Sequence, residues 1–390
     1  MKPSGAIVSL TAVLWDFPLI GRTRMLTEAW HAVDQPALFI EPPHSYRSVL
    51  RAFADRIKGR PAAAPHIIRP WPARYPARWW TRMDERRLRK MLHNSAIDLR
   101  RRLERHGPLN GATAIVVSPI WLPWLEKLPF GRVIYDCIDD LAVHAPDADR
   151  LRLFQRWEKE LIDRCNAIVV TAEELRTHVT TIRPNVRVET IRNGVDVDRF
   201  QNAAAQSPTP GDLPTDDRPI IGFVGALYEW IDFDLIRRAA EELPQAHFVL
   251  VGPDDQPDDI ESLRRLPNIS LLGPRPYAQV PAYVNRFDIC WVPFKTGRIA
   301  AAANPVKIYE YLALAKPVVT TPVADTASFG DLVRVGSTHD EIIAHLTALT
   351  ADPRPTTADA ESRIAFARRN SWQQRAAQYT ELIASLDQSN

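Results

Sequence analysis

Short apolar runs alternate along the whole chain with segments whose apolar residues recur at helical spacing. The runs in the first half are apolar on both faces, which is typical of parallel strands covered by helices on each side. Between the last two runs, Leu151, Phe154, Trp157, Leu161, Ile162 and Cys165 form a single helical stripe. We predict strands in this half at Ile7–Val13, Ala37–Ile40, His66–Arg69, Ala114–Ser118, Val133–Cys137 and Ala167–Thr171.

A second alternating series follows residues 201–218, which are rich in Pro, Ala and Asp and have no apolar period. Two such series joined by a linker predict an α/β fold of two Rossmann-like domains that face a central cleft. We place the first domain at 1–200, the linker at 201–218, the second domain at 219–371, and a C-terminal helix at 372–390 that crosses back to the first domain. The second series predicts strands at Ile220–Val224, Phe248–Val251, Ile269–Leu272, Ile289–Val292 and Pro317–Thr320, with helices such as Phe233–Leu243 and Lys307–Leu314 between them.

Composition and cysteine spacing indicate a globular cytoplasmic protein. The chain has 390 residues, 45% apolar and 25% charged, which suits two ordinary domains. Cys137, Cys165 and Cys290 form no CxxC pair, so neither a disulfide framework nor a zinc site is expected. The apolar run near the N-terminus could be a signal peptide, but Asp16 and Pro18 interrupt it, and we interpret it as a buried strand. No apolar stretch reaches the 18 residues of a membrane span.

Residues 69–106 carry twelve basic side chains against four acidic ones, interleaved with tryptophans. Basic charge beside tryptophan is typical of proteins that bind anionic membrane surfaces, so we predict peripheral association with the inner face of the plasma membrane through this stretch. The alternative is a solvated basic helix with a core-facing Trp pair. No nucleic-acid-binding motif accompanies the charge, and nucleic acid is not an expected partner.

A candidate anion site lies in the second series. Gly225 follows the first strand, where a glycine lets the backbone approach a phosphate. Pro305 suits the start of a helix, and Lys307 then stands in the first turn, where a bound anion would stabilise a cation. Glu310 shares that helix face and could accept hydrogen bonds from a ribose diol. The alternative is a Lys307–Glu310 pair on a solvated face.

Three aspartates follow a buried strand of the first series, at the edge where α/β sheets place their chemistry. Transfer of a sugar to a hydroxyl needs a base for its proton or a carboxylate that stabilises positive charge at the anomeric carbon. We predict Asp139 as the base, with Asp136 and Asp140 as neighbours. Capping of a helix could claim one of the three, and His144 is an alternative base. Their spacing matches no metal-ligand pattern, so no metal is expected.

Further motifs resemble the GT-B glycosyltransferases of the broad family-4-like group. The donor-site helix of that group resembles residues 304–313, and its C-terminal helix resembles Ser371-Trp372 with Arg375. The stretch from Trp15 to Pro43 is similar to bacterial enzymes of teichuronic-acid and exopolysaccharide biosynthesis. Other matching segments are Ile191–Asp196 with Phe200, Val251–Pro253, Leu266–Asn268 with Leu272-Gly273, Arg275–Tyr277 with Val280-Pro281 and Tyr283, and Phe287–Phe294.

The resemblance implies roles for individual residues of the donor site. It implies that Glu310 holds the nucleotide ribose and that Gly225 and Lys307 lie at the diphosphate. It implies that the loop from Gly273 to Tyr277, which contains Arg275 and Pro276, holds the base, with a stack on Tyr277. The other donor-site residues that it implies are Asn304, Pro305 and Val306, with backbone groups at the phosphate or sugar, and Tyr228 after the first strand.

Two departures from that pattern concern the sugar and the phosphates. The second acidic residue that many members have eight positions before Glu310 is Ala302 here. Tyr228 and Glu229 replace the usual Arg and Lys after the glycine. We expect Lys295 and Arg298 to supply the missing positive charge, although both could be loop surface charges.

The resemblance implies an enzyme that transfers a sugar, a hexosyltransferase of cell-surface polysaccharide biosynthesis. The donor is expected to be a UDP- or GDP-sugar, bound as a substrate and with no further cofactor, and the acceptor a glycan or a polyprenyl-diphosphate-linked glycan. Two alternatives stay open: a nucleotide-sugar epimerase of the same fold, and a catalytically inactive carbohydrate-binding scaffold. A dehydrogenase is not expected, because no GxGxxG follows the first strand of either domain.

Overall fold

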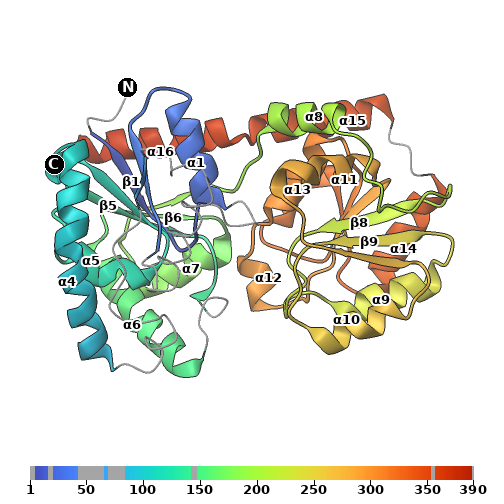
Figure 1. Ribbon diagram of the computed structural model, residues 1–390, viewed down its shortest axis with the longest axis horizontal. Helices are drawn as coiled ribbons and strands as arrows, with labels where there is room; N and C mark the ends of the chain where they lie inside the picture. Colours follow the sequence, from blue (N-terminus) through green and yellow to red (C-terminus); the bar gives the residue numbers. More distant parts are fainter. Residues whose placement is uncertain are drawn as a thin grey trace, which may run out of the picture.

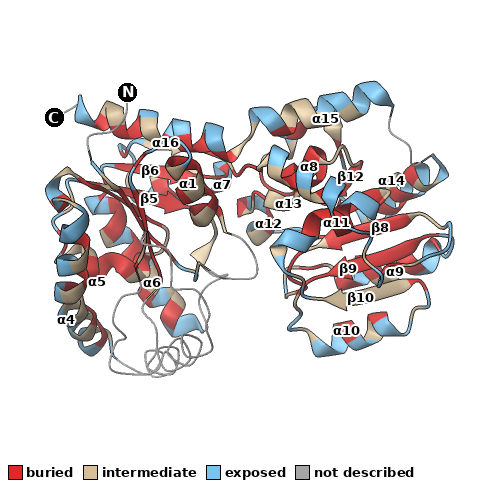
Figure 2. Ribbon diagram, turned by 45° about the horizontal axis from the view of Figure 1, so that its top comes forward, coloured by how far each residue is buried: buried red, intermediate tan, exposed pale blue. Residues whose placement is uncertain are grey.

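The computed structural model describes residues 5–15, 21–42, 66–68, 84–141, 147–352 and 356–388. These residues form two α/β lobes that lie side by side, each built on a parallel sheet with helices packed against it (Figure 1). The central strands of each sheet are buried on both faces, while the helices turn one face to solvent (Figure 2). The predicted α/β class with two Rossmann-like domains is confirmed.

The described sheet of the first lobe has seven strands in the order β3-β2-β1-β4-β5-β6-β7. The order reverses at β1, which pairs with β2 on one side and β4 on the other. In open α/β sheets such a reversal marks the edge at which ligands bind, beyond the carboxyl ends of the strands. The strands are β1 (Ile7–Leu10), β2 (Ala37–Ile40), β3 (Ile67–Ile68), β4 (Thr113–Val116), β5 (Arg132–Cys137), β6 (Ala167–Val170) and β7 (Val188–Thr190).

The longer helices of this lobe begin at capping aspartates. Asp84 accepts a hydrogen bond from the N–H of Arg87, and Asp147 accepts one from the N–H of Arg150, which satisfies free donors of the first turn. Leu88, Leu92 and Leu99 of the first of these helices recur at helical spacing and are buried. The helices are α1 (Arg22–His31), α4 (Glu85–Leu103), α5 (Leu122–Leu125), α6 (Ala148–Arg164) and α7 (Glu173–Ile182), with short 3-10 turns η1 (Glu104–His106), η2 (Leu109–Gly111) and η3 (Pro119–Trp121).

The described sheet of the second lobe has six strands in the order β10-β9-β8-β11-β12-β13, with its reversal at β8. The predicted strands all form, with boundaries within a few residues. The apolar pattern missed β7 and β13, because each has three residues with a charged one in the middle. The strands are β8 (Ile220–Val224), β9 (His247–Val251), β10 (Ile269–Gly273), β11 (Ile289–Val292), β12 (Val318–Thr320) and β13 (Val333–Val335).

Residues 201–206, at the start of the predicted linker, are helical. These residues belong to α8 (Val197–Gln206), which Asp196 caps and whose Phe200 and Ala204 are buried. Two apolar positions four residues apart give too weak a period to recognise from sequence. The other helices are α9 (Phe233–Glu242), α10 (Pro257–Arg264), α11 (Val280–Arg286), α12 (Arg298–Ala302), α13 (Val306–Ala313), α14 (His339–Ala351) and α15 (Thr357–Arg369), with 3-10 turns η5 (Tyr277–Gln279) and η6 (Thr326–Leu332).

The chain passes between the lobes twice, and the two passages lie side by side. Val195 N–H donates to Asn370 O (3.1 Å), and Trp372 N–H donates to Val195 O (3.3 Å). Gly194 permits this approach, since a Cβ there would lie 2.6 Å from Asn370 O. After the second passage α16 (Trp372–Asp387) lies along the first lobe and packs on α1 (Figure 1).

Candidate functional site

Gly225 follows β8 at the point where the strand order of the second sheet reverses. Its N–H donates to Val251 O (2.9 Å), which holds it against the end of β9. A Cβ at position 225 would lie 2.8 Å from Phe223 Cζ and 2.9 Å from Lys307 Cε. Glycine is therefore required here because the lysine side chain occupies the space that a larger residue would need.

Lys307 stands in the first turn of α13, next to Gly225. Its Nζ lies 5.2 Å from the centroid of the Phe223 ring and 5.1 Å from that of Phe294. The side chain is only partly exposed, and burial lowers its pKa to about 8, with a small opposing effect of the Glu310 carboxylate. The ammonium is thus held at a helix N-terminus between two aromatic rings, an arrangement that a bound anion would stabilise.

Glu310 lies one turn further along α13 and is buried. Burial raises its pKa, while a hydrogen bond from the Tyr277 hydroxyl (2.6 Å) and the charge of Lys307 lower it. Burial also raises the pKa of Tyr277 well above its usual value, so the tyrosine is the donor. The carboxylate is not on a solvated face, and the alternative of a surface Lys307–Glu310 pair is not what the structure has.

The start of α13 contacts the passage between the lobes. Pro305 is the N-cap residue of α13, and Val306 packs partly buried against apolar residues of the first lobe. The Asn304 Oδ1 accepts a hydrogen bond from Asn193 N–H (2.9 Å), and its backbone oxygen accepts one from Asn193 Nδ2 (2.6 Å). The Asn304 Nδ2 is buried without a hydrogen-bond partner among the described residues.

The loop after β10 contains the residues that the resemblance assigns to the base. Gly273 ends β10 with a φ of +69°, which glycine favours, and Pro276 is exposed. Arg275 pairs with Asp212 (2.5 Å) and also donates to the Tyr283 hydroxyl (2.9 Å), which ties the segment between the lobes to this loop.

Two aromatic residues predicted for the donor site contact neighbours within the second lobe. The Tyr277 ring lies 5.9 Å from the Phe200 ring, with the Arg199 guanidinium over its face, so the predicted stack on a base would compete with contacts that are already made. Tyr228 is partly buried and packs edge-to-face on Trp230, with ring centroids 5.1 Å apart.

Asp136 is fully buried and ion-paired. Arg22 Nε donates to its Oδ2 (3.1 Å), and the same guanidinium donates to Ile191 O (2.7 Å), Asn193 Oδ1 (3.1 Å) and the Tyr379 hydroxyl (2.9 Å). Arg22 thereby joins α1, β5, the first passage between the lobes and α16. The structure assigns Asp136 to this junction, not to the surface where an acceptor would bind.

Asp140 pairs with Arg298 of the second lobe at 2.8 Å, and Asp139 lies beside it at the same strand end. From the sequence we expected Arg298 to supply charge to the donor phosphates, whereas in the structure it pairs with Asp140. Asp147, further along the chain, caps α6. His144 and residues 69–83 of the predicted membrane stretch lie outside the described residues.

Ala302, at the position where many family members are acidic, is buried in the contact between the lobes. Together with Ala324 it belongs to the apolar cluster of the first lobe. A carboxylate at position 302 would be placed among apolar side chains, at a high desolvation cost. The alanine at position 302 therefore fits an apolar contact between the lobes, which the sequence pattern did not reveal.

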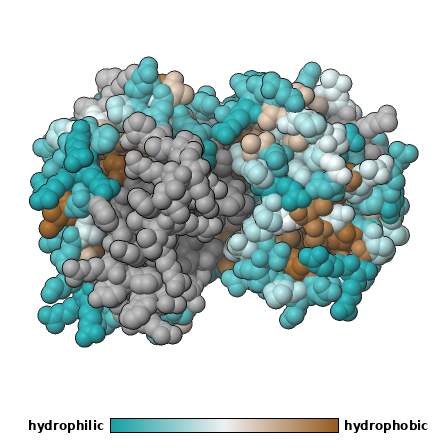
Figure 3. Space-filling view, in the orientation of Figure 1, coloured by the Kyte–Doolittle hydropathy of each residue, from teal (hydrophilic) through white to brown (hydrophobic). Residues whose placement is uncertain are grey.

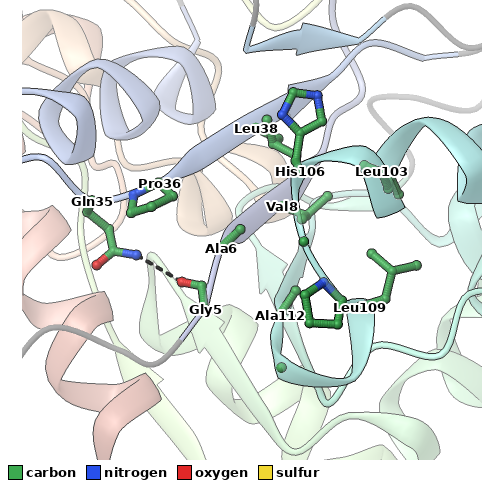
Figure 4. Close-up of a pocket in the computed structure, with 13 residues that line it drawn as sticks. Gly5, Ala6, Val8, Gln35, Pro36, Leu38, Leu103, His106, Leu109 and Ala112 are labelled. Carbon is green, nitrogen blue, oxygen red and sulfur yellow. Dashed lines mark hydrogen bonds between the residues drawn. The ribbon is translucent and has the colours of Figure 1, made fainter.

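Two cavities of the described structure lie away from these residues. One of about 360 Å³ is lined by Ala6, Pro36, His106 and Ala112, at the amino ends of β1, β2 and β4 (Figure 4). Another of about 500 Å³ lies between α1 and α16. Chemistry in open α/β sheets is expected at the carboxyl ends of the strands, where Gly225 and Asp139 lie, so we place the candidate site there and not in either cavity.

The described part of the chain shows neither a metal-binding group of side chains nor a membrane-spanning helix. No group of three or more His, Cys, Asp or Glu side chains is arranged to hold a metal ion there. No described helix has both the length and the apolar character to cross a membrane.

Comparison with known proteins identifies the second lobe. Residues 218–352 match the family model of glycosyl transferases group 1. These residues form a glycosyl transferases group 1 domain. The group 1 domain contains β8 to β13 and α13, and hence Gly225, Lys307 and Glu310. The resemblance seen in the sequence is confirmed here.

The match with curated relatives extends over only part of their own length. A teichuronic acid biosynthesis glycosyltransferase, TuaH of Bacillus subtilis, is 32% identical over 53% of this chain and 54% of its own. The D-inositol 3-phosphate glycosyltransferase of Mycobacterium bovis is 24% identical over 50% of this chain and 44% of its own. The chain therefore matches about half the length of these relatives.

Solved structures match the whole described fold. Sucrose-phosphate synthase of Thermosynechococcus elongatus has a TM-score of 0.67 at 16% identity, with 99% of this chain and 100% of that chain covered. HepE of Anabaena, solved in complex with UDP and glucose, has a TM-score of 0.68 at 15% identity, with 98% and 100% covered. At such identities the likeness establishes the fold, which is GT-B as predicted.

Proposed function

We propose that this protein transfers a sugar from a nucleoside diphosphate sugar to a glycan or lipid-linked acceptor in bacterial cell-surface polysaccharide biosynthesis. The observation that carries the proposal is the Lys307 ammonium, partly buried at the N-terminus of α13 and against Gly225 at the sheet reversal. An anionic diphosphate there would be stabilised by the lysine and by the free N–H groups of the helix start. The group 1 domain, the similarity to TuaH and the UDP complex of HepE support this class of donor.

The remaining donor contacts follow from the same helix. We propose that Glu310 accepts hydrogen bonds from the ribose diol once the Tyr277 hydroxyl has moved aside, and that Asn304, Pro305 and Val306 face the phosphates or sugar with backbone groups. Helix dipole and lysine together would stabilise the departing diphosphate without a metal ion.

Proton transfer in this proposal belongs to the first lobe. Asp136 and Asp140 are each held by an arginine, and we propose that Asp139, at the same strand end, takes the proton of the acceptor hydroxyl. As that hydroxyl oxygen bonds to the anomeric carbon, the bond to the diphosphate oxygen breaks and the nucleoside diphosphate leaves with the electron pair.

The acceptor side involves the membrane. We propose that the protein works at the cytoplasmic face of the plasma membrane, where an acceptor linked to polyprenyl diphosphate would be found. The basic outer face of α4 supports this location, since Arg86, Lys90 and Arg101 are exposed beside Ile97, which is 58% exposed.

Thermal stability with a panel of UDP- and GDP-sugars tests the donor assignment. A bound donor raises the unfolding temperature, and the effective nucleotide sugar should also be hydrolysed slowly to nucleoside diphosphate and free sugar. Lys307→Met should abolish the thermal shift, and Asp139→Asn should keep the shift and lose the hydrolysis. Lys127→Met is the matched control, because Lys127 is exposed and precedes β5, at the amino edge of the first sheet and away from the carboxyl edge with Asp139.

Two outcomes would contradict the proposal. If no nucleotide sugar stabilises the protein, or if Lys307→Met responds like the wild type, the donor site is elsewhere. If the donor is converted to an isomeric nucleotide sugar with no release of nucleoside diphosphate, the protein is an epimerase.

A further inference from the structure

Contacts between the lobes fall into two groups. The first surrounds the two passages of the chain and includes the Asn193–Asn304 hydrogen bonds and an ion pair of Arg192 with Asp325 (2.9 Å). Because these contacts lie next to the connecting backbone, they can persist when the lobes rotate about it. The second group is the contact of α12 with the first lobe, where α12 packs on α7 (Figure 1).

An ion pair of two-point geometry forms the centre of the second group. Arg298, the first residue of α12, donates from Nε to Asp140 Oδ2 at 2.8 Å and from Nη2 to Asp140 Oδ1 at 3.0 Å. The Asp140 side chain is 15% exposed and that of Arg298 is 62% exposed. Two parallel hydrogen bonds fix the orientation of the guanidinium as well as its distance.

The surroundings of this pair fit a contact that can open. Ala302 at the end of α12 is buried in the apolar cluster of the first lobe, and its small side chain gives close approach with little interlocking. His178 on α7, hydrogen-bonded to the buried Glu158 (2.8 Å), lies near enough to interact electrostatically with both members of the pair.

We propose that Arg298 is a positioning residue whose ion pair with Asp140 holds the two lobes closed across the site. The inference rests on the proposed function for its consequence: closure brings the carboxyl edge of the first sheet, with Asp139, toward the donor bound at α13. Arg298 acts through Asp140 and touches neither donor nor acceptor. This assigns Asp140 to lobe closure and leaves proton transfer to Asp139.

We call the Arg298–Asp140 ion pair the latch, and its exposure to solvent sets its strength. An ion pair whose arginine is largely exposed contributes little free energy and is screened by salt, so it changes the ratio of closed to open molecules severalfold and does not lock them. A latch of this strength would let acceptor enter and product leave while still favouring the closed arrangement.

Small-angle X-ray scattering measures closure without any ligand. Arg298→Ala should have a larger radius of gyration than the wild type at low salt (~50 mM). The wild type should expand toward the value of the variant at high salt (~500 mM), where the Debye length is much shorter. The reversed pair, Asp140→Arg with Arg298→Asp, should restore the compact value, and Arg238→Ala, which breaks the pair of Arg238 with Asp340 inside the second lobe, should change nothing.

The kinetic readout separates positioning from donor binding. With the nucleotide sugar that gives the largest thermal shift, Arg298→Ala should lose severalfold in the kcat of donor hydrolysis while KM and the thermal shift stay within twofold of wild type. Arg298→Lys should recover part of the loss, since the charge remains.

Each result decides one of the two proposals. An unchanged radius of gyration for Arg298→Ala at low salt, or a reversed pair as expanded as the single variant, overturns the latch. If no nucleotide sugar binds, the proposed function fails, but scattering still decides whether Arg298 holds the lobes together.

Discussion

The position of Lys307 explains why several residues around it have the identity they have. Gly225 leaves room for its Cε and Nζ, and Phe223 and Phe294 cover its ammonium with ring faces. Burial disfavours the charged form of Lys307, and a bound anion would stabilise that form. This arrangement makes the protonation state of one side chain the main electrostatic variable of the proposed donor site.

Donor affinity should fall as the pH rises above neutrality. The pKa of Lys307 is about 8 in the ligand-free protein, and a bound diphosphate favours the protonated form and raises that pKa. Above pH 8 the free lysine has lost its proton, so binding requires proton uptake and weakens. Calorimetric titration with UDP in two buffers of different ionisation enthalpy should show this uptake. Lys307→Met should bind UDP more weakly, by roughly tenfold or more, with no uptake, and equal uptake in this variant would contradict the assignment.

Gly225→Ala should weaken UDP binding by roughly tenfold, an overpacking cost of about 1–2 kcal/mol. The new methyl group would lie 2.8 Å from Phe223 and 2.9 Å from Lys307, so the lysine side chain must shift away from the phosphate position. Gly211→Ala is the matched control, because a Cβ at Gly211 meets no atom within 4 Å. Calorimetry on both variants checks the difference, and equal affinities would show that position 225 does not border the ligand.

Helix α4 has two faces of different character. Leu88, Leu92 and Leu99 face the core, and the outer face is basic. Some of its arginines are neutralised along the helix, as in the Arg100–Glu104 and Arg102–Asp98 pairs, whereas no ion pair is found among described residues for Arg86, Lys90 and Arg101. In the space-filling view this edge of the first lobe is mainly hydrophilic (Figure 3).

Replacing Arg86, Lys90 and Arg101 together by Gln should reduce binding to anionic vesicles by roughly tenfold or more, since each basic residue near such a surface contributes about 1 kcal/mol. Co-sedimentation with vesicles that contain phosphatidylglycerol checks this, with phosphatidylcholine vesicles as the uncharged reference. The control replaces Arg237, Arg238 and Arg264 of the second lobe by Gln, which removes the same charge. Equal losses in the two triple variants would mean that only net charge matters and that α4 has no special role.

The junction around Arg22 holds the molecule together at its largest scale. The Arg22 guanidinium on α1 donates to groups on β5, the first passage and α16, and Asp136 supplies the counter-charge in a fully buried position. Burying this pair is costly, but removing one partner leaves the other charge unpaired. The junction lies beside the passages between the lobes, so it also defines the point about which the lobes can rotate.

Arg22→Ala should destabilise the first lobe by about 3–5 kcal/mol, the usual cost of an unpaired buried charge. Thermal unfolding followed by circular dichroism should show an earlier transition, and Asp136→Asn should be affected less because a neutral amide can still accept a hydrogen bond. Arg24→Ala is the control, because Arg24 forms a half-exposed pair with Glu28 on the same helix. Equal unfolding temperatures for Arg22→Ala and Arg24→Ala would refute the junction.

The apolar pattern by itself determined the two parallel sheets, most strand positions and the segment that carries Lys307 and Glu310, because these depend on local periodicity and on short-range helix geometry. The proposed donor-site residues from Asn304 to Glu310 share one stretch of chain around α13, so their proximity could be predicted, whereas Gly225 and Tyr277 meet them only in the folded protein. The partners of the three aspartates could not, since Arg22, Arg298 and the α16 residue Tyr379 are distant in sequence and meet them only after the lobes have packed. Whether a carboxylate is exposed, paired or buried is decided by these long-range contacts, because the free energy of a charge depends on everything that surrounds it.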